Sequence, residues 1–333
     1  MWRYAGVLCL LAVAGASPLS AAPLTEVTFG TNWIAQAEHG GYYQALADGT
    51  YEKYGLKVTI VPGGPRAANR MLMTVGKLDF YMGGSMIQAF SAAEKDIPTV
   101  VVAAHFQKDP QILMSHPGQG FDTFEDLKRS NDLLLSKDGV ATFFQWMKAE
   151  YGFRDEQVRP FGFNPAPFIA DKKAVQQGYV TAEPLTIEKA AGFKPNVFLL
   201  ADYGFSTYAT TVETRREVVE KSPDLVQRFV DASSIGWHNY LHGDNAGANA
   251  LIKRDNPEMT DELLAYSVTK LKQHGIVESG DASTLGIGAM TDARMKDFFD
   301  KMVKSGLFKA DLDYRKAYTL QFVNKGVGLE LNK

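Results

Sequence analysis

The segment from residue 97 to residue 106, IPTVVVAAHF, contains five consecutive apolar residues. Such a run predicts a strand that is covered on both faces, which is typical of the parallel sheets of α/β proteins. Strand-like segments precede it at 27–32, 57–63 and 78–84, and helix-like segments separate them. This alternation of strands and helices predicts an α/β fold with a parallel sheet.

The same alternation starts again after residue 106. Further strand-like segments lie at 112–116, 133–136, 158–163, 176–181 and 196–204. From about residue 222 the chain carries amphipathic helical patterns instead. We therefore predict two α/β units followed by a helical tail. The length of the chain suits two domains.

The first residues have the pattern of a secretory signal peptide. Arg3 precedes an apolar run at 5–16, and small residues at 20–22 follow it. The run is too short to span a bilayer, so we expect residues 1–22 to be removed on export. The single cysteine, Cys9, lies inside this segment. The exported chain would then carry no thiol, which excludes thiolate zinc sites, iron–sulfur clusters and cysteine nucleophiles.

Composition and motifs argue against several classes of function. The net charge is −3 and no basic block is present, so nucleic acid is not an expected partner. His238 and His242 are spaced i, i+4, but no acid completes a zinc-protease pattern. No nucleophile-elbow or phosphate-loop motif occurs either. We expect no cofactor, no catalytic metal and no catalytic residues.

Three segments resemble the periplasmic substrate-binding proteins of ABC importers. They are HGGYYQALADGTYEKYGLKVTIV at 39–61, VGKLDFYMGG at 75–84, and the stretch 173–184, which ends in an acid–proline step. Their order and spacing resemble the nitrate, sulfonate and taurine binding proteins and their thiamine-pyrimidine (NMT1-like) relatives. A eukaryotic thiamine-pyrimidine synthase shares this family. That branch is cytosolic and cysteine-rich, so the signal peptide and the absence of a mature cysteine favour the binding protein over the enzyme.

The resemblance implies a type II two-lobed binding-protein fold in which each lobe is a mostly parallel sheet flanked by helices. Lobe 1 would hold 23–106 plus 207–333 with the helical tail, and lobe 2 would hold 107–206. Two crossings, near 106–110 and 205–211, would act as the hinge for closure around a ligand. The resemblance also implies a periplasmic monomer that delivers a small molecule to an ABC permease in the inner membrane.

A ligand would lie in the interlobe cleft, at the carboxyl ends of the strands. Trp33 follows the first strand, where it either packs in the core or stacks on a flat ligand. His39 stands beside two glycines that permit close approach of a ligand to the backbone, or else it is a surface residue. Amides at helix starts and an acid in the cleft add polar contacts. The candidate ligand-binding residues are Trp33, His39, Tyr42, Ser85, Met86, Gln107, Gly139, Asn164, Glu183 and Tyr203.

Three functions follow from this set of residues. The leading hypothesis is capture of a small, flat heteroaromatic solute such as a thiamine-precursor pyrimidine, because aromatic and acidic groups suit ring N–H donors. The second is capture of a sulfonate, taurine or nitrate, with Arg66 and the amides at Ser85 and Gly139 holding the anion. Arg70 is a further candidate for that role. The third is a pyrimidine-biosynthesis enzyme on the same fold.

Overall fold

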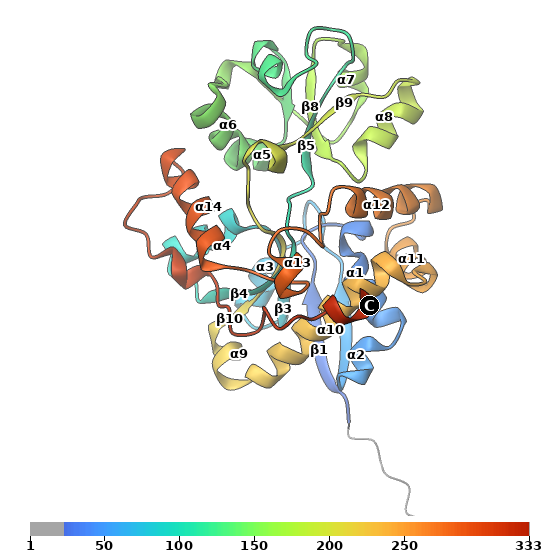
Figure 1. The fold of residues 1–333 in the computed structure, drawn as a ribbon, viewed down its shortest axis with the longest axis vertical. Helices are drawn as coiled ribbons and strands as arrows, with labels where there is room; N and C mark the ends of the chain where they lie inside the picture. The colour runs from blue at the N-terminus through green and yellow to red at the C-terminus, as the bar shows by residue number, and fades with distance from the viewer. Residues whose placement is uncertain (1–22, 333) are drawn as a thin grey trace, which may run out of the picture.

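The computed structural model describes residues 23–332 as two α/β lobes stacked end to end (Figure 1). The expected signal peptide at 1–22 and Cys9 lie outside the described residues. We call the part built around the first sheet lobe 1 and the part built around the second sheet lobe 2. None of the helices within residues 23–332 is long and apolar enough to cross a membrane.

Lobe 1 is built on a five-stranded sheet of mixed direction. Its strand order is β2 (Leu56–Val61), β1 (Thr25–Gly30), β3 (Phe80–Ser85), β10 (Ala209–Arg215) and β4 (Thr99–Phe106). Strands β2, β1 and β3 are parallel to one another, whereas β10 runs antiparallel to both β3 and β4. The chain that returns from lobe 2 inserts β10 into the sheet.

Strand β4 corrects one detail of the sequence analysis. All eight of its residues are buried, as its apolar run predicts, but its neighbour in the sheet is antiparallel. It lies at the sheet edge, and the C-terminal tail covers it there. The backbone of Ala104 donates a hydrogen bond to Gly288, and Thr319 donates one to Val101. The tail therefore closes the sheet edge at β4, whereas helices α4 and α10 pack against the strand.

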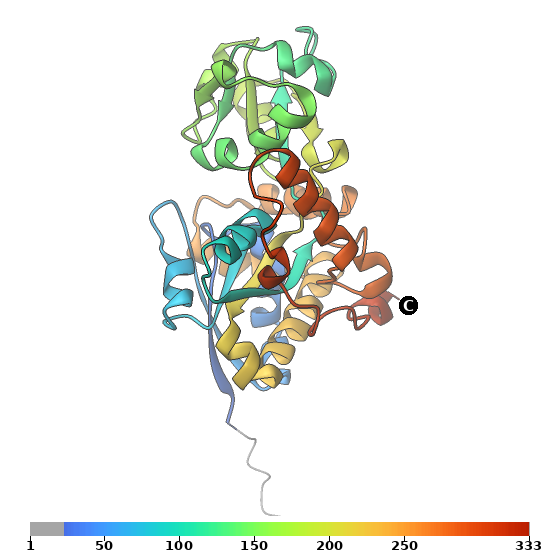
Figure 2. The ribbon, with the colours of Figure 1, turned by 90° about the vertical axis from the view of Figure 1, so that its left-hand side faces the viewer.

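Ten helices and several short turns surround this sheet (Figure 2). The helices are α1 (Gly40–Ala47), α2 (Thr50–Lys53), α3 (Asn69–Thr74), α4 (Met86–Glu94), α9 (Arg216–Lys221), α10 (Pro223–His242), α11 (Ala246–Asp255), α12 (Asp261–Gln273), α13 (Ala282–Leu285) and α14 (Asp292–Lys304). Helix α10 supplies much of the core: its Phe229 ring stacks on Phe80 with centroids 4.2 Å apart. Aromatic pairs of this kind stabilise a core beyond their buried area.

The double glycine next to His39 serves helix packing. A Cβ atom added at Gly41 would lie 2.2 Å from the Trp237 ring of α10, and one added at Gly40 would lie 2.1 Å from the Tyr240 ring. On the facing helix, a Cβ at Gly236 would lie 2.2 Å from the carbonyl oxygen of Gly41. These glycines therefore let α1 approach α10 closely, and the close approach of a ligand is not their reason.

Lobe 2 repeats the mixed pattern. Its strand order is β7 (Val158–Pro160), β6 (Leu133–Leu135), β8 (Val175–Tyr179), β5 (Gln111–Ser115) and β9 (Asn196–Leu199). Strand β6 is parallel to β7 and β8, and β5 is antiparallel to β8 and β9. Its helices are α5 (Lys137–Ala141), α6 (Phe143–Tyr151), α7 (Ala166–Ala170) and α8 (Glu183–Ala191). The two-lobed α/β fold is thus confirmed: in each sheet four strands point the same way and one strand, β10 or β5, runs antiparallel between its neighbours.

The remaining helical segments of the described chain are 3-10 turns at Ala37–His39, Phe124–Arg129, Asp155–Gln157, Leu200–Tyr203, Tyr314–Ala317 and Leu329–Asn332. The first of these turns, η1 (Ala37–His39), matters for function. It connects the end of β1 to α1 and lies on the side of lobe 1 that faces lobe 2: the side chain of Thr181 in lobe 2 donates a hydrogen bond to the Glu38 carboxylate.

One arginine holds both crossings between the lobes. Arg294 of α14 donates to the backbone carbonyl and the side-chain oxygen of Gln107 in the first crossing. It also donates to the carbonyls of Ser206, at 3.2 Å, and Thr207 in the second crossing. Its guanidinium lies 4.1 Å from the centre of the Tyr208 ring. The planar fork of arginine suits such a set of acceptors, which a lysine ammonium does not match.

We expect Arg294→Lys to lower the free energy of unfolding by about 2–3 kcal/mol, because several hydrogen bonds to a charged, largely buried group are lost. Chemical denaturation measures the change. Arg254→Lys is the matched control, since its side chain is 63% exposed and pairs only with its neighbour Asp255. That substitution is expected to cost less than about 0.5 kcal/mol. Equal effects of both substitutions would contradict the role of Arg294.

Candidate ligand-binding site

A cavity of about 400 Å³ lies between the two lobes. Lobe 1 contributes the loop after β1, the turn η1 and the turn between β3 and α4. Lobe 2 contributes the turns that follow β6 and β8, and the first crossing forms part of the wall. The site therefore lies where parallel strands end, which is where open α/β sheets commonly bind ligands. We call this cavity the interlobe pocket.

Aromatic rings from both lobes line the interlobe pocket. Trp33 of lobe 1 and Phe163 of lobe 2 contact each other where the lobes meet, with ring centroids 5.3 Å apart and planes tilted by 45°. Phe163 is 55% exposed and has a backbone φ of 62°, which is unusual for a bulky residue. The other aromatic residues of the pocket are Tyr81, Phe143, Phe161, Tyr179 and Phe205. Walls of this kind suit a flat ligand.

Four carboxyl groups line the same pocket: Glu38 from lobe 1, Asp109 from the first crossing, and Asp138 and Glu183 from lobe 2. No lysine or arginine of residues 23–332 lines it. Burial raises the pKa of all four acids, and brings those of Asp109 and Glu183 to about 7. The interlobe pocket is therefore acidic in composition, and its carboxyl groups are only partly ionised near neutral pH.

Backbone and hydroxyl donors hold three of these acids in place. The amide of Tyr179 donates to Glu183 at 2.7 Å, and the amide of Gln111 donates to Asp109 at 3.0 Å. The carboxylate of Glu38 accepts from Thr181, whose carbonyl in turn accepts from Ser267 of α12 at 2.8 Å. Glu38 therefore belongs both to the pocket wall and to a contact between the lobes.

His39 completes the polar part of the wall. Its side chain is fully buried, lines the pocket, and has no hydrogen-bond partner on either ring nitrogen within residues 23–332. Burial lowers the pKa of His39 to about 3, so the imidazole is neutral at physiological pH. A buried polar ring with two unpaired nitrogens is costly unless a ligand or water pairs with it.

Four of the ten candidate residues line the interlobe pocket: Trp33, His39, Ser85 and Glu183. Each follows a strand or begins the helix after it, which is the position from which the sequence argument started. Whether they bind a ligand stays a prediction.

Three candidates belong to the packed interior of the protein. Tyr42 is buried in lobe 1, where its hydroxyl lies 2.9 Å from Nδ1 of His105. The amide of Met86 donates to the Thr207 hydroxyl, and that of Gly139 donates to Ser136. These groups form hydrogen bonds within the protein, and the three residues do not line the interlobe pocket.

Gln107 and Asn164 also lie away from the pocket. Gln107 is fully buried and donates to the carbonyls of Ala104 and Ala289. Asn164 is exposed, and its side-chain oxygen accepts from the amide of Ala166, which forms a local turn. The prolines around Asn164 hold a surface loop and not a pocket amide.

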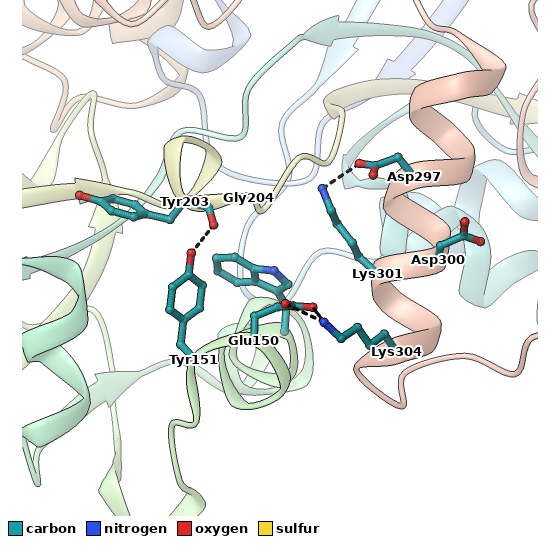
Figure 3. A pocket seen from close by; sticks show the side chains of 9 residues that line it. Glu150, Tyr151, Tyr203, Gly204, Asp297, Asp300, Lys301 and Lys304 are labelled. Carbon is teal, nitrogen blue, oxygen red and sulfur yellow. Dashed lines mark hydrogen bonds and ion pairs between the residues drawn. The ribbon is translucent and has the colours of Figure 1, made fainter.

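Tyr203 lines an outer groove instead (Figure 3). This groove, of about 460 Å³, separates α6 from α14, and the ion pair of Glu150 and Lys304 crosses it at 2.9 Å. The carbonyl of Tyr203 accepts from the Tyr151 hydroxyl, and its ring stacks on Phe124. Phe205, two residues later, is the one that lines the interlobe pocket.

The sequence argument missed Glu38, Asp109, Asp138, Tyr179 and Phe163. Some signal was present, because Asp138 lies in the turn after a buried strand and Tyr179 ends one. No local sequence pattern marks Asp109, because its place in the pocket wall depends on the path of the first crossing between the lobes.

The arginines proposed for anion binding do not reach the interlobe pocket. Arg66 is exposed and is not part of its wall. Arg70 donates two hydrogen bonds to Glu213, at 2.9 and 3.0 Å, and one to the carbonyl of Gln88. A guanidinium held in this way is already neutralised.

The raised pKa of Glu183 predicts a pH-dependent effect of Glu183→Gln on the ligand-free protein. The folded state binds more protons than the unfolded state between the ordinary carboxyl pKa and about 7, so the wild type loses stability as the pH rises through this window. Glutamine does not titrate. We expect the variant to equal the wild type at about pH 4, below the ordinary carboxyl pKa, and to exceed it by about 1–2 kcal/mol at pH 8, after allowance for solvent in the cleft. Thermal unfolding at both pH values tests this, and a constant difference would contradict it.

A cleft between two α/β lobes joined by two crossings defines the periplasmic-binding-protein fold. A model of the NMT1/THI5-like family matches residues 36–246, and the chain belongs to that family. The chain is also 24% identical over 326 residues to the riboflavin-binding protein RibY of Chloroflexus aurantiacus, with 94% of this chain and 90% of the relative covered.

Solved structures share the fold at low sequence identity. The periplasmic aliphatic sulphonate binding protein SsuA from Escherichia coli matches with a TM-score of 0.65 and 13% identity, over 88% of this chain and 91% of that protein. The desulfurization enzyme DSZB matches with a TM-score of 0.59 and 13% identity, over 93% of this chain and all of that protein. The fold is therefore used by binding proteins and by at least one enzyme.

Proposed function

We propose that this protein is the exported solute-binding component of an ABC importer, and that it captures a small, flat heteroaromatic solute with ring or amino N–H groups. The observation that carries the proposal is the interlobe pocket, in which aromatic rings from both lobes surround four carboxyl groups and a neutral imidazole. Carboxylates accept N–H bonds, and aromatic walls stack on flat rings. Binding would close the lobes about the two crossings and present them to a permease.

The two other functions have less support. A sulfonate, taurine or nitrate would meet carboxyl groups without a compensating cation among the lining residues, which is unfavourable in a desolvated site. An enzyme on this fold has a precedent in DSZB. The neighbouring carboxyls here are held by backbone amides and hydroxyls, an arrangement that suits the binding of donors.

Thermal unfolding of protein purified from the periplasm tests the proposal. The panel contains 4-amino-5-hydroxymethyl-2-methylpyrimidine, riboflavin, taurine, an alkanesulfonate and nitrate. Riboflavin is included because the relative RibY is a riboflavin-binding protein. A ligand at a hundred times its Kd stabilises the native state by about 2.7 kcal/mol and raises the melting temperature. A shift with the heterocycles supports the proposal, and a shift with the anions alone overturns it.

A further inference from the structure

We propose that the interlobe pocket selects a positively charged heteroaromatic ring over its neutral and anionic relatives. This inference rests on the proposed function and narrows its ligand class. Four acids approach the cavity from lobe 1, the first crossing and lobe 2, and the described lining residues contain no lysine or arginine to balance them. A positively charged ring can pair with these carboxyl groups in their ionised form, whereas a neutral ring offers them no counter-charge.

Neighbouring charges do not cancel this excess. Asp109 and Tyr179 face Asp138, and Glu183 faces Glu38 and Tyr179, so the groups around each acid are acidic or neutral. The guanidinium of Arg70, which interacts electrostatically with the lining residue Tyr81, is engaged by Glu213 through two hydrogen bonds. A cation on the ligand is therefore the missing counter-charge.

His39 provides an independent indication of a ligand at this place. Its side chain is fully buried against the cavity, and neither ring nitrogen has a partner among residues 23–332. A neutral imidazole carries one N–H donor and one acceptor nitrogen. The acceptor can take an N–H from a cationic ring or its amino substituent, and this pairing removes the cost of a buried unpaired nitrogen.

The aromatic walls favour a cation for a separate reason. Trp33 and Phe163 belong to opposite lobes, and Tyr179 and Phe161 extend the wall in lobe 2. The faces of such rings attract cations, most strongly when the cation is removed from water. A flat cation can in addition stack face to face on these rings, which an aliphatic ammonium cannot do.

Binding of a cation is expected to release protons. Burial in the pocket raises the pKa of Asp109 and Glu183, because it disfavours the ionised form. A positive ring favours ionisation, so the acids lose protons when it binds. The affinity for a cation is therefore expected to rise with pH up to about 7 and to level off above it.

Isothermal titration calorimetry tests the inference with three compounds that share one ring and carry a positive, a neutral and a negative charge. The probes are 1-methylnicotinamide, nicotinamide and nicotinate, with the neutral pyrimidine of the first panel and its N-methyl cation as a second pair. We expect each cation to bind at least about tenfold tighter than its neutral partner, and nicotinate to bind weakest. Titrations at pH 7 in buffers of different ionisation enthalpy are expected to report proton release for the cations.

Two variants locate the effect. Glu183→Gln and Asp109→Asn are expected to reduce the preference for the cation about tenfold, whereas Glu150→Gln, in the outer groove, leaves it unchanged. Neutral probes that bind as tightly as the cations would overturn the charge inference and leave the proposed function standing. If no heterocycle of either panel binds, both fall. A preference for cations that survives Glu183→Gln and Asp109→Asn would overturn the assignment to this pocket.

Discussion

A Gly41→Ala chain is expected to lose about 3 kcal/mol of folding free energy, because the added methyl group would lie 2.2 Å from the ring of Trp237. That ring is fully buried among Tyr42, Phe106 and Tyr240, so it has no free space into which to move. Relief would require α1 to separate from α10 along its length. For a chain of this size, 3 kcal/mol corresponds to a fall of about 5 °C in melting temperature.

Gly236→Ala on the facing helix is expected to act through the same interface. Its added methyl would lie 2.2 Å from the carbonyl oxygen of Gly41. The double variant is then expected to cost less than the sum of the single variants, because one separation of the helices relieves both clashes. Gly162→Ala is the control, since no atom lies within 4 Å of its added methyl. If Gly41→Ala unfolds at the wild-type temperature, α1 and α10 do not pack as closely as described.

These glycines show what local sequence patterns predict and what they do not. A helix between the strand-like segments 27–32 and 57–63 was expected, but the two glycines at the start of α1 were assigned to ligand approach. Their partner, α10, lies about two hundred residues later in the chain, and no local pattern connects them. The position of β10 between β3 and β4 is another pairing of distant segments. Alternation predicts elements, whereas their pairing depends on the whole chain.

The candidate site shows the same contrast between features that local patterns predict and features that depend on the whole chain. Trp33, Ser85 and Glu183 line the pocket. They could be predicted because the sequence shows where strands end, and open α/β sheets bind ligands at those ends. Met86 and Gly139 occupy similar positions, but their amides donate to hydroxyls of the protein itself. Which amide at a helix start remains available is decided by side chains that a sequence pattern does not place.

Phe163 is the residue through which the pocket is expected to control release of its ligand. Its ring faces Trp33 of the opposite lobe and lies 5.3 Å from Phe161 of its own lobe. The left-handed backbone at φ 62° costs a bulky residue on the order of 1–2 kcal/mol. A strained aromatic residue that is 55% exposed lowers the stability of the fold, and this local cost favours a role for its ring in ligand contact.

Phe163→Gly is therefore expected to separate stability from affinity. Glycine adopts the same backbone without strain, so the empty protein is expected to gain up to about 1 kcal/mol. Loss of the ring opens one side of the cleft, and the tightest heterocycle of the panels is expected to bind about tenfold more weakly, mainly through faster dissociation. Stopped-flow fluorescence of Trp33 and thermal unfolding measure the two effects.

Phe163→Tyr provides the comparison that assigns the effect to the ring. Tyrosine keeps both the aromatic face and the strained backbone, so its affinity and stability are expected to stay close to those of the wild type. If Phe163→Gly binds as tightly as the wild type, the ring does not contact the ligand and the contact between Trp33 and Phe163 serves the lobes alone. If both variants lose affinity equally, the loop around Phe163 acts through its backbone, and the aromatic wall of lobe 2 is reduced to Phe161 and Tyr179.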